Sequence, residues 1–244
     1  SWASCVGWTA LSAVEADLTE SGRRSWLRRS GVPSGSVDGT TGCKHGPMPG
    51  RGRPKDPQDL MLWPGAGTGA DHESLVAIDK GIPEVPVLRV DFPYRREGRK
   101  APDRAPKLIA AINEEVEAAA RRLSVEPARI VIGGRSMGGR MCSMAAAEGL
   151  DVAGVVLIAY PLHPPGKPEK LRTDHLGDLS VPSLWLCGDR DPFGTPTELA
   201  AALDLVKGPV TSVTLEGRHD LRNAGAATLA EIRDWLGLRR RAAR

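Results

Sequence analysis

From about residue 58 onward, short apolar runs alternate with longer stretches in which apolar positions recur at helical spacing. The apolar runs predict strands at 59–63, 86–91, 129–133, 154–159, 182–187 and 210–215. The periodic stretches predict helices at 71–80, 105–123, 137–149, 196–206 and 223–237. Regular alternation of strands and helices predicts an α/β fold with a mostly parallel sheet that helices cover on both faces.

The first part of the chain has a different character. Residues 1–56 contain Gly, Pro, Ser, Thr and Arg without sustained apolar periodicity. Such a composition predicts a poorly ordered amino-terminal extension. Residues 57–244 are then expected to form one domain with a single sizeable core.

Composition limits the partners and the compartment. The formal net charge is +3, and the basic residues at 239–244 read as a solvated chain end rather than a nucleic-acid site. No apolar run is long enough to span a bilayer. Scattered cysteines, two of them inside predicted core elements, indicate buried thiols in a reducing compartment rather than disulfides or a metal site. We therefore expect a cytoplasmic monomer or homodimer without cofactor, metal, nucleic acid or membrane. The cysteines are Cys5, Cys43, Cys142 and Cys187.

The segment 130–140 carries the strongest chemical signal. A β-branched run leads into Gly134-Arg135-Ser136-Met137-Gly138, and a helical pattern follows. This strand–turn–helix context is the nucleophile elbow, in which a tight turn exposes a serine hydroxyl above the sheet. Side chains at the two flanking glycines would collide with neighbouring elements. Ser136 is therefore the predicted nucleophile.

An acid and a base follow the serine in the order that the elbow requires. Asp191 lies in a Gly/Pro-rich loop just after the predicted strand 182–187, and it is the favoured acid. Asp189 is closer to that strand and is expected to hold the turn instead. His219 follows the predicted strand 210–215 and is the only histidine downstream of the acid, so it is the predicted base.

The chemistry explains why these three residue types belong together. A serine hydroxyl is a weak nucleophile at neutral pH until an imidazole accepts its proton. The carboxylate fixes the imidazole tautomer and stabilises the imidazolium. The oxyanion also needs donors, which we expect to be the backbone N–H groups of Met137 and of Ala66 in the glycine loop.

That glycine loop also permits a competing interpretation. Gly65-x-Gly67-x-x-Ala70 follows an apolar strand, and Asp91 ends the next strand about 20 residues later, as in a dinucleotide-binding fingerprint. Pro64 between the strand and the glycines argues against it. An NAD(P)-dependent oxidoreductase would also leave the elbow and its acid and base unexplained.

The stretch between the fourth and fifth predicted strands is short. Tyr160 to Arg172 leaves room for a proline-rich loop but not for a lid domain, so the site should be open. His163 and Lys167 either line that site or lie on a surface loop without a role in it.

Several longer motifs together resemble a known family. They are Gly65-Ala66-Gly67 with Asp71-His72, Phe92-Pro93-Tyr94, Pro102 to Leu108, Gly133 to Arg140, Tyr160 to Arg172, and Asp191 to Pro196. On these motifs the chain resembles compact bacterial α/β-hydrolases related to dienelactone hydrolases, and the hydrolase-like domain in a subunit of a eukaryotic histone-acetyltransferase complex. The resemblance covers roughly residues 58–238. It implies an α/β-hydrolase fold with a minimal or absent lid and the triad Ser136, Asp191 and His219.

The chain departs from that family in three places. Pro64 stands where the family has a histidine before the oxyanion loop, and Asp220-Leu221 follow the last histidine in place of Ser-Phe-like residues. The family's first two strands are not visible in residues 1–56. We therefore expect a serine hydrolase of small carboxylic esters or thioesters, with a non-catalytic hydrolase-like scaffold as the alternative.

Overall fold

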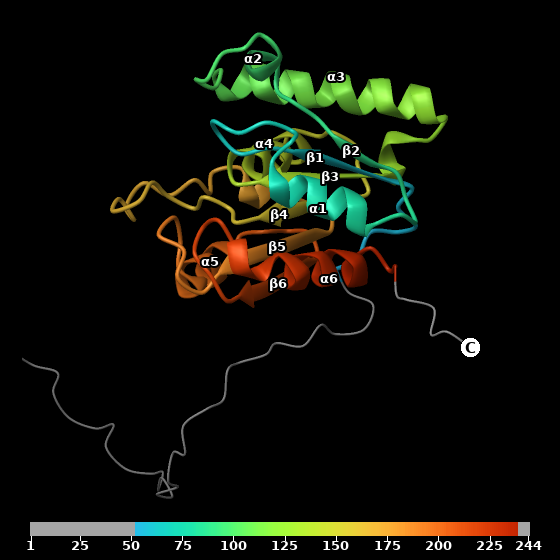
Figure 1. Ribbon diagram of the computed structural model, residues 1–244. Coiled ribbons are helices and arrows are strands. Elements are labelled where there is room, and N and C mark those ends of the chain that lie inside the picture. Colours follow the sequence, from blue (N-terminus) through green and yellow to red (C-terminus); the bar gives the residue numbers. More distant parts are fainter. Residues whose placement is uncertain (1–51, 239–244) are drawn as a thin grey trace, which may run out of the picture. The chain divides into compact units, whose positions relative to one another are not determined.

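Six strands form one sheet in the order β2-β1-β3-β4-β5-β6 in the computed structural model, which describes residues 52–238 (Figure 1). All five strand pairs are parallel. The strands are β1 Asp59–Trp63, β2 Val87–Arg89, β3 Ile130–Arg135, β4 Gly154–Ile158, β5 Ser183–Gly188 and β6 Val210–Leu215. The predicted α/β class and the parallel sheet are confirmed.

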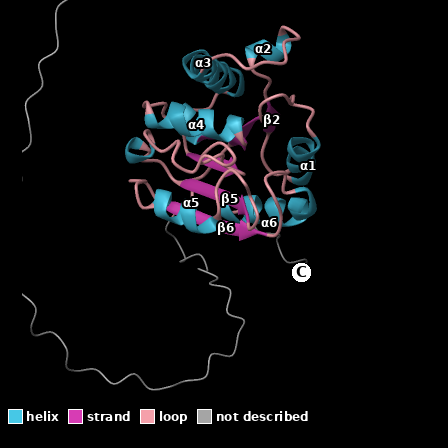
Figure 2. Cartoon of the chain, turned by 90° about the vertical axis from the view of Figure 1, so that its left-hand side faces the viewer, coloured by secondary structure: helices cyan, strands magenta, loops and turns pink. Residues whose placement is uncertain are grey.

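Helices cover both faces of this sheet (Figure 2). The helices are α1 Glu73–Gly81, α2 Pro93–Arg96, α3 Ala105–Leu123, α4 Met137–Ala147, α5 Pro196–Leu203 and α6 Gly225–Trp235, with 3₁₀ turns at Pro127–Arg129, Leu176–Asp178 and Arg222–Ala224. Helices α3, α4 and α5 pack on one face, and α1 and α6 on the other. None of the described helices is long and apolar enough to cross a membrane.

The structure shifts several predicted boundaries by one to three residues and adds one helix. Strand β2 covers only Val87–Arg89, although the carbonyl of Pro86 and the N–H of Val90 still form hydrogen bonds with β1. Helix α2 was not predicted, because four residues are too few to show a period. Helix α5 ends at Leu203 rather than at residue 206.

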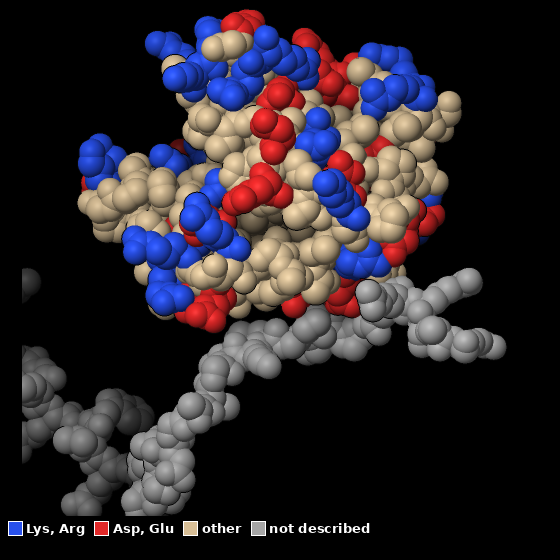
Figure 3. Space-filling view, in the orientation of Figure 1, with Lys and Arg blue, Asp and Glu red and all other residues tan. Residues whose placement is uncertain are grey.

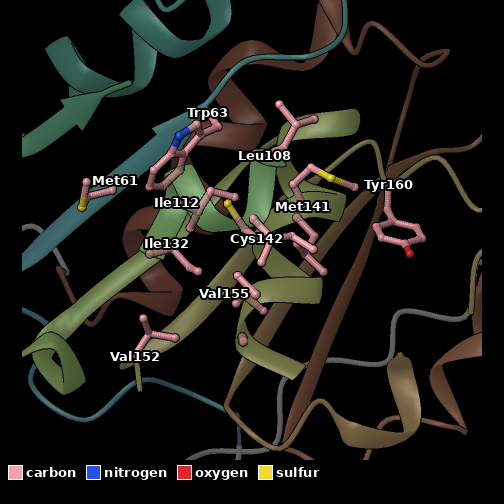
Figure 4. Packing of buried hydrophobic residues seen from close by; sticks show 14 of the residues in the cluster. Met61, Trp63, Leu108, Ile112, Ile132, Met141, Cys142, Val152, Val155 and Tyr160 are labelled. Carbon is pink, nitrogen blue, oxygen red and sulfur yellow. The ribbon is translucent and has the colours of Figure 1, made fainter. Parts of the chain in front are cut away.

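The core follows the alternation of side chains along each strand. In β1, Met61 and Trp63 face the cluster under α3 and α4, whereas Leu60 and Leu62 face the cluster under α1 and α6. Figure 4 shows Met61 and Trp63 on this strand and Ile112 of α3 nearby. Because both faces of the sheet are covered, the central strands are apolar without interruption.

The packed chain begins upstream of residue 57, where the sequence placed the domain boundary. Gly52 and Pro54 are buried, and the indole Nε1 of Trp235 donates to the carbonyl of Gly52. Arg53 forms a salt bridge of 2.6 Å with Asp234. Residues 1–51 and 239–244 lie outside the described residues, and so do the predictions for the amino-terminal extension, two of the cysteines and the basic end.

The two cysteines within the described residues are buried thiols, as the sequence predicted. Cys142 lies in α4 and Cys187 in β5, and burial raises the pKa of each thiol. On the surface, positive and negative side chains are interspersed over the face shown in Figure 3. Charge therefore does not gather into a single basic area on that face.

One buried charge lies at the beginning of β1. Asp59 is completely buried, and neither carboxylate oxygen has a hydrogen-bond partner within residues 52–238. Burial raises the pKa of Asp59 to about 6, against the opposing effects of the Leu60 backbone N–H and the charge of Arg122. Because the folded pKa exceeds the unfolded value, the carboxylate destabilises the fold increasingly between about pH 4 and pH 6.

We predict that Asp59→Asn stabilises the protein at pH 7.5 by on the order of 1–3 kcal/mol, since a shift of one pKa unit corresponds to about 1.4 kcal/mol. At pH 3 the difference between the variant and the parent should largely disappear, because Asp59 is then mostly protonated in both the folded and the unfolded state. Urea unfolding at the two pH values measures this difference. A stability difference that does not change with pH would contradict the prediction.

Candidate active site

Ser136 occupies a strained turn between β3 and α4. Its backbone has φ 52° and ψ −116°, a conformation that a non-glycine residue rarely adopts. A Cβ on Gly134 or Gly138 would lie 2.2 or 2.3 Å from the carbonyl oxygen of Trp63, so neither position accepts a side chain. The strand, the sharp turn and the helix therefore hold Ser136 at the carboxyl end of β3.

The structure brings the three predicted residues into hydrogen-bond contact. His219 Nε2 lies 2.8 Å from Ser136 Oγ, and His219 Nδ1 lies 2.8 Å from Asp191 Oδ2. Ser136 follows β3, Asp191 follows β5 and His219 follows β6. Because the strands are parallel, these three loops meet at one edge of the sheet.

Asp191 is held from its own loop as well. The carboxylate is 3% exposed, and its Oδ1 accepts the backbone N–H of Phe193 at 2.8 Å. The ring of Phe193 stacks on the imidazole of His219, with centroids 4.0 Å apart. Phe193 falls within the Asp191 to Pro196 motif, but its contact with the histidine was not predicted.

The alternative acid, Asp189, contacts the turn rather than the histidine. Its Oδ1 accepts the backbone N–H of Gly217 at 2.8 Å, and Arg190 Nε lies 3.3 Å from the same oxygen. The Gly217 N–H, more than the adjacent Arg190, lowers the pKa of Asp189. The exposed Asp189 therefore joins the loops after β5 and β6 to each other.

The glycine loop after β1 lies beside the serine. A Cβ on Gly65 would be 3.5 Å from Ser136 Cβ, and the carbonyl of Gly65 accepts the hydroxyl of Thr68 at 3.0 Å. Asp91 Oδ1 accepts the backbone N–H of Ala70 at 2.8 Å. Asp91 thus fastens this loop, which gives it a role other than the ribose contact of the competing interpretation. Ala66, the predicted oxyanion donor, is exposed in the same loop.

In the loop after β4, His163 and Lys167, whose roles the sequence did not decide, have different environments. His163 is buried, with Nδ1 2.9 Å from the carbonyl of Pro164 and Nε2 3.5 Å from Glu198 Oε2. Lys167 is exposed. The hydroxyl of Tyr160 donates to the carbonyl of Arg172 at 2.7 Å and closes the base of the loop. His163 therefore packs within this loop and against α5.

A family model described as "Alpha/beta hydrolase domain" matches residues 56–235. The chain belongs to the alpha/beta hydrolase family. Within the described residues 52–238, the match covers all six strands and leaves out only residues 52–55 and 236–238.

Solved structures agree with the alpha/beta hydrolase fold. Dienelactone hydrolase from Anabaena variabilis is 18% identical, covers 76% of this chain and 88% of its own, and has a TM-score of 0.58. The type II thioesterase BorB from the borrelidin biosynthetic cluster is 21% identical over 76% of this chain and 96% of its own, with a TM-score of 0.55. Est1E from Butyrivibrio proteoclasticus is 19% identical over 75% and 90%, also at 0.55. At these identities the likeness is one of fold.

Proposed function

We propose that this hydrolase cleaves small carboxylic esters or thioesters through an acyl-enzyme on Ser136. One observation carries the proposal: two consecutive contacts of 2.8 Å link the carboxylate of Asp191 through His219 to the hydroxyl of Ser136. A nucleophile, a base and an orienting acid in this arrangement activate a serine for acyl transfer.

In the proposed reaction, Ser136 Oγ attacks the carbonyl carbon while His219 Nε2 takes the hydroxyl proton. Asp191 accepts Nδ1–H and stabilises the imidazolium that forms. The backbone N–H groups of Met137 and Ala66 receive the oxyanion. The intermediate collapses when His219 returns the proton to the leaving alkoxide or thiolate, and water then releases the acid by the reverse sequence.

The comparisons support this chemistry at the level of the family. One structural neighbour is a dienelactone hydrolase and another is a type II thioesterase. The substrate of this chain stays a proposal, as do the cytoplasmic location and the absence of a cofactor. The resemblance to a histone-acetyltransferase complex subunit also stays a prediction.

A fluorophosphonate probe tests the proposal directly. The intact protein should be labelled, and peptide mass spectrometry should find the label on Ser136. Folded protein that resists labelling and does not hydrolyse p-nitrophenyl acetate would favour a non-catalytic scaffold. A thermal shift with millimolar NAD or NADP would instead favour the oxidoreductase interpretation.

Short acyl chains should be the better substrates. No helix or strand lies between β4 and the turn at Leu176–Asp178, and the loop from Pro161 to Arg172 offers a long tail little apolar cover. On p-nitrophenyl esters we expect kcat/KM to fall from acetate or butyrate towards decanoate. A series in which kcat/KM rises with chain length would contradict this prediction.

A further inference from the structure

Arg135 is the last residue of β3 and directly precedes the nucleophile. Its side chain is partly buried, and one guanidinium nitrogen, Nη2, donates to the backbone carbonyl of His219 at 3.2 Å. This contact joins residues 84 positions apart in the sequence. The end of β3, directly before Ser136, is therefore also bonded to the backbone of His219, the predicted base.

The guanidinium lies between two loops of the site. Its Nη1 is 3.5 Å from the place that a Cβ on Gly65 would take, and Ser136 Cβ is equally close to that place. Arg135 therefore reaches from the glycine loop, which supplies the proposed oxyanion donor, to the loop that carries His219. No other side chain in residues 52–238 donates to the carbonyl of His219.

Ion pairing does not explain this arginine. Within the described part of the chain, Arg135 makes no salt bridge of 4.0 Å or less, and its buried Nε has no hydrogen-bond partner. Burial lowers the pKa of Arg135, while the charges of Asp220, Asp191 and Glu73 act in the opposite direction. A buried cation without a close partner adds little to stability, so an apolar side chain would serve the fold equally well.

The loop that carries His219 is also fixed before and after this residue. Asp189 accepts the backbone N–H of Gly217, two residues before His219. After His219 the chain passes through Leu221, which has a positive φ of 47° and is buried. Between these two points, the bond from Arg135 is the side-chain hydrogen bond that reaches the backbone of His219 itself.

We infer that Arg135 is a positioning residue, which fixes the backbone of His219 relative to the end of β3 and so keeps the imidazole within reach of Ser136. The inference rests on the proposed function. Ser136 follows Arg135 in the chain, and His219 is bonded to Arg135 through its carbonyl. A shift of the loop that carries His219 therefore changes the distance between His219 Nε2 and Ser136 Oγ. A displacement of about 1 Å in a catalytic constellation can lower the rate by about 10²-fold.

The test compares Arg135→Met, which keeps much of the side-chain length but has no donor, with Arg190→Met. Arg190 is an exposed arginine beside Asp189 and controls for the loss of one positive charge near the site. We expect Arg135→Met to lower kcat for p-nitrophenyl acetate by about 10- to 100-fold with KM changed less than about 3-fold. Its Tm should be unchanged or higher, and Arg190→Met should retain parental turnover. In Arg135→Ala, added guanidinium ion should restore part of the lost rate.

A second readout does not depend on turnover. Proton NMR should show a low-field Nδ1–H signal of His219 in the parent, and Arg135→Met should broaden or lose it. If the parent hydrolyses esters and Arg135→Met retains both kcat and this signal, the positioning role is wrong. A lower Tm with full turnover per labelled Ser136 would also overturn it, because the role would then be structural. A parent that neither turns over nor labels would refute the proposed function, and the NMR signal would still test the position of His219.

Discussion

Ser136→Ala is expected to lower kcat for small esters by about 10⁶-fold, the size of the loss measured when a serine protease loses its nucleophile. Alanine keeps the small side chain that the elbow requires but has no hydroxyl to form the acyl-enzyme. The variant should fold, because alanine keeps the backbone N–H that Ser136 donates to the carbonyl of Ile158 at 2.8 Å. Stopped-flow and steady-state assays with p-nitrophenyl acetate measure the loss of turnover, and Tm measures whether the variant is folded.

The chain offers a matched control for this experiment. Ser143, which lies in α4, forms a second serine–histidine contact, with Oγ 2.8 Å from His175 Nε2. That serine is fully buried, its hydroxyl donates to the carbonyl of Arg140, and burial lowers the pKa of His175 to about 4. Ser143→Ala should therefore keep turnover and fluorophosphonate labelling. If Ser136→Ala retains turnover, the acyl-enzyme on Ser136 is refuted.

The predictable part of the fold comes from local patterns. β1 and β6 lie at the predicted residues, and α3 covers Ala105–Leu123 as its strong periodicity indicated. The glycines on both sides of Ser136 predicted the sharp turn, because the backbone of β1 comes so close that no other residue fits at these positions. A parallel sheet then places every strand's carboxyl end at one edge, so the order of Ser136, Asp191 and His219 along the chain was enough to predict their meeting.

Contacts that depend on how loops fold in space could not be predicted. Phe193 stacks on His219, and Arg135 reaches the carbonyl of the same residue, but no periodicity or spacing encodes either contact. The buried Asp59 is a similar case, because a charged residue at a strand start reads as exposed. The role of Asp91 in holding Ala70 also follows from loop geometry alone.

Asp191→Asn is expected to lower turnover by about 10⁴-fold while the protein stays folded. The amide oxygen can still accept the backbone N–H of Phe193, but the amide nitrogen then faces His219 Nδ1. The imidazole is forced into the tautomer that carries its proton on Nε2, so it cannot accept the proton of Ser136. The loss should appear in kcat and in the rate of fluorophosphonate labelling, with Tm nearly unchanged.

Asp189→Ala is the comparison that distinguishes the two neighbouring acids. It removes the acceptor of the Gly217 N–H and so loosens the link between the loops after β5 and β6. We expect a lower Tm with turnover per folded molecule retained, whereas Asp189→Asn, which keeps an acceptor, should lie closer to the parent in both respects. If Asp189→Ala loses turnover about 10⁴-fold and Asp191→Asn does not, the roles of the two acids are exchanged. If neither variant slows turnover, His219 is not the base that the proposed reaction requires.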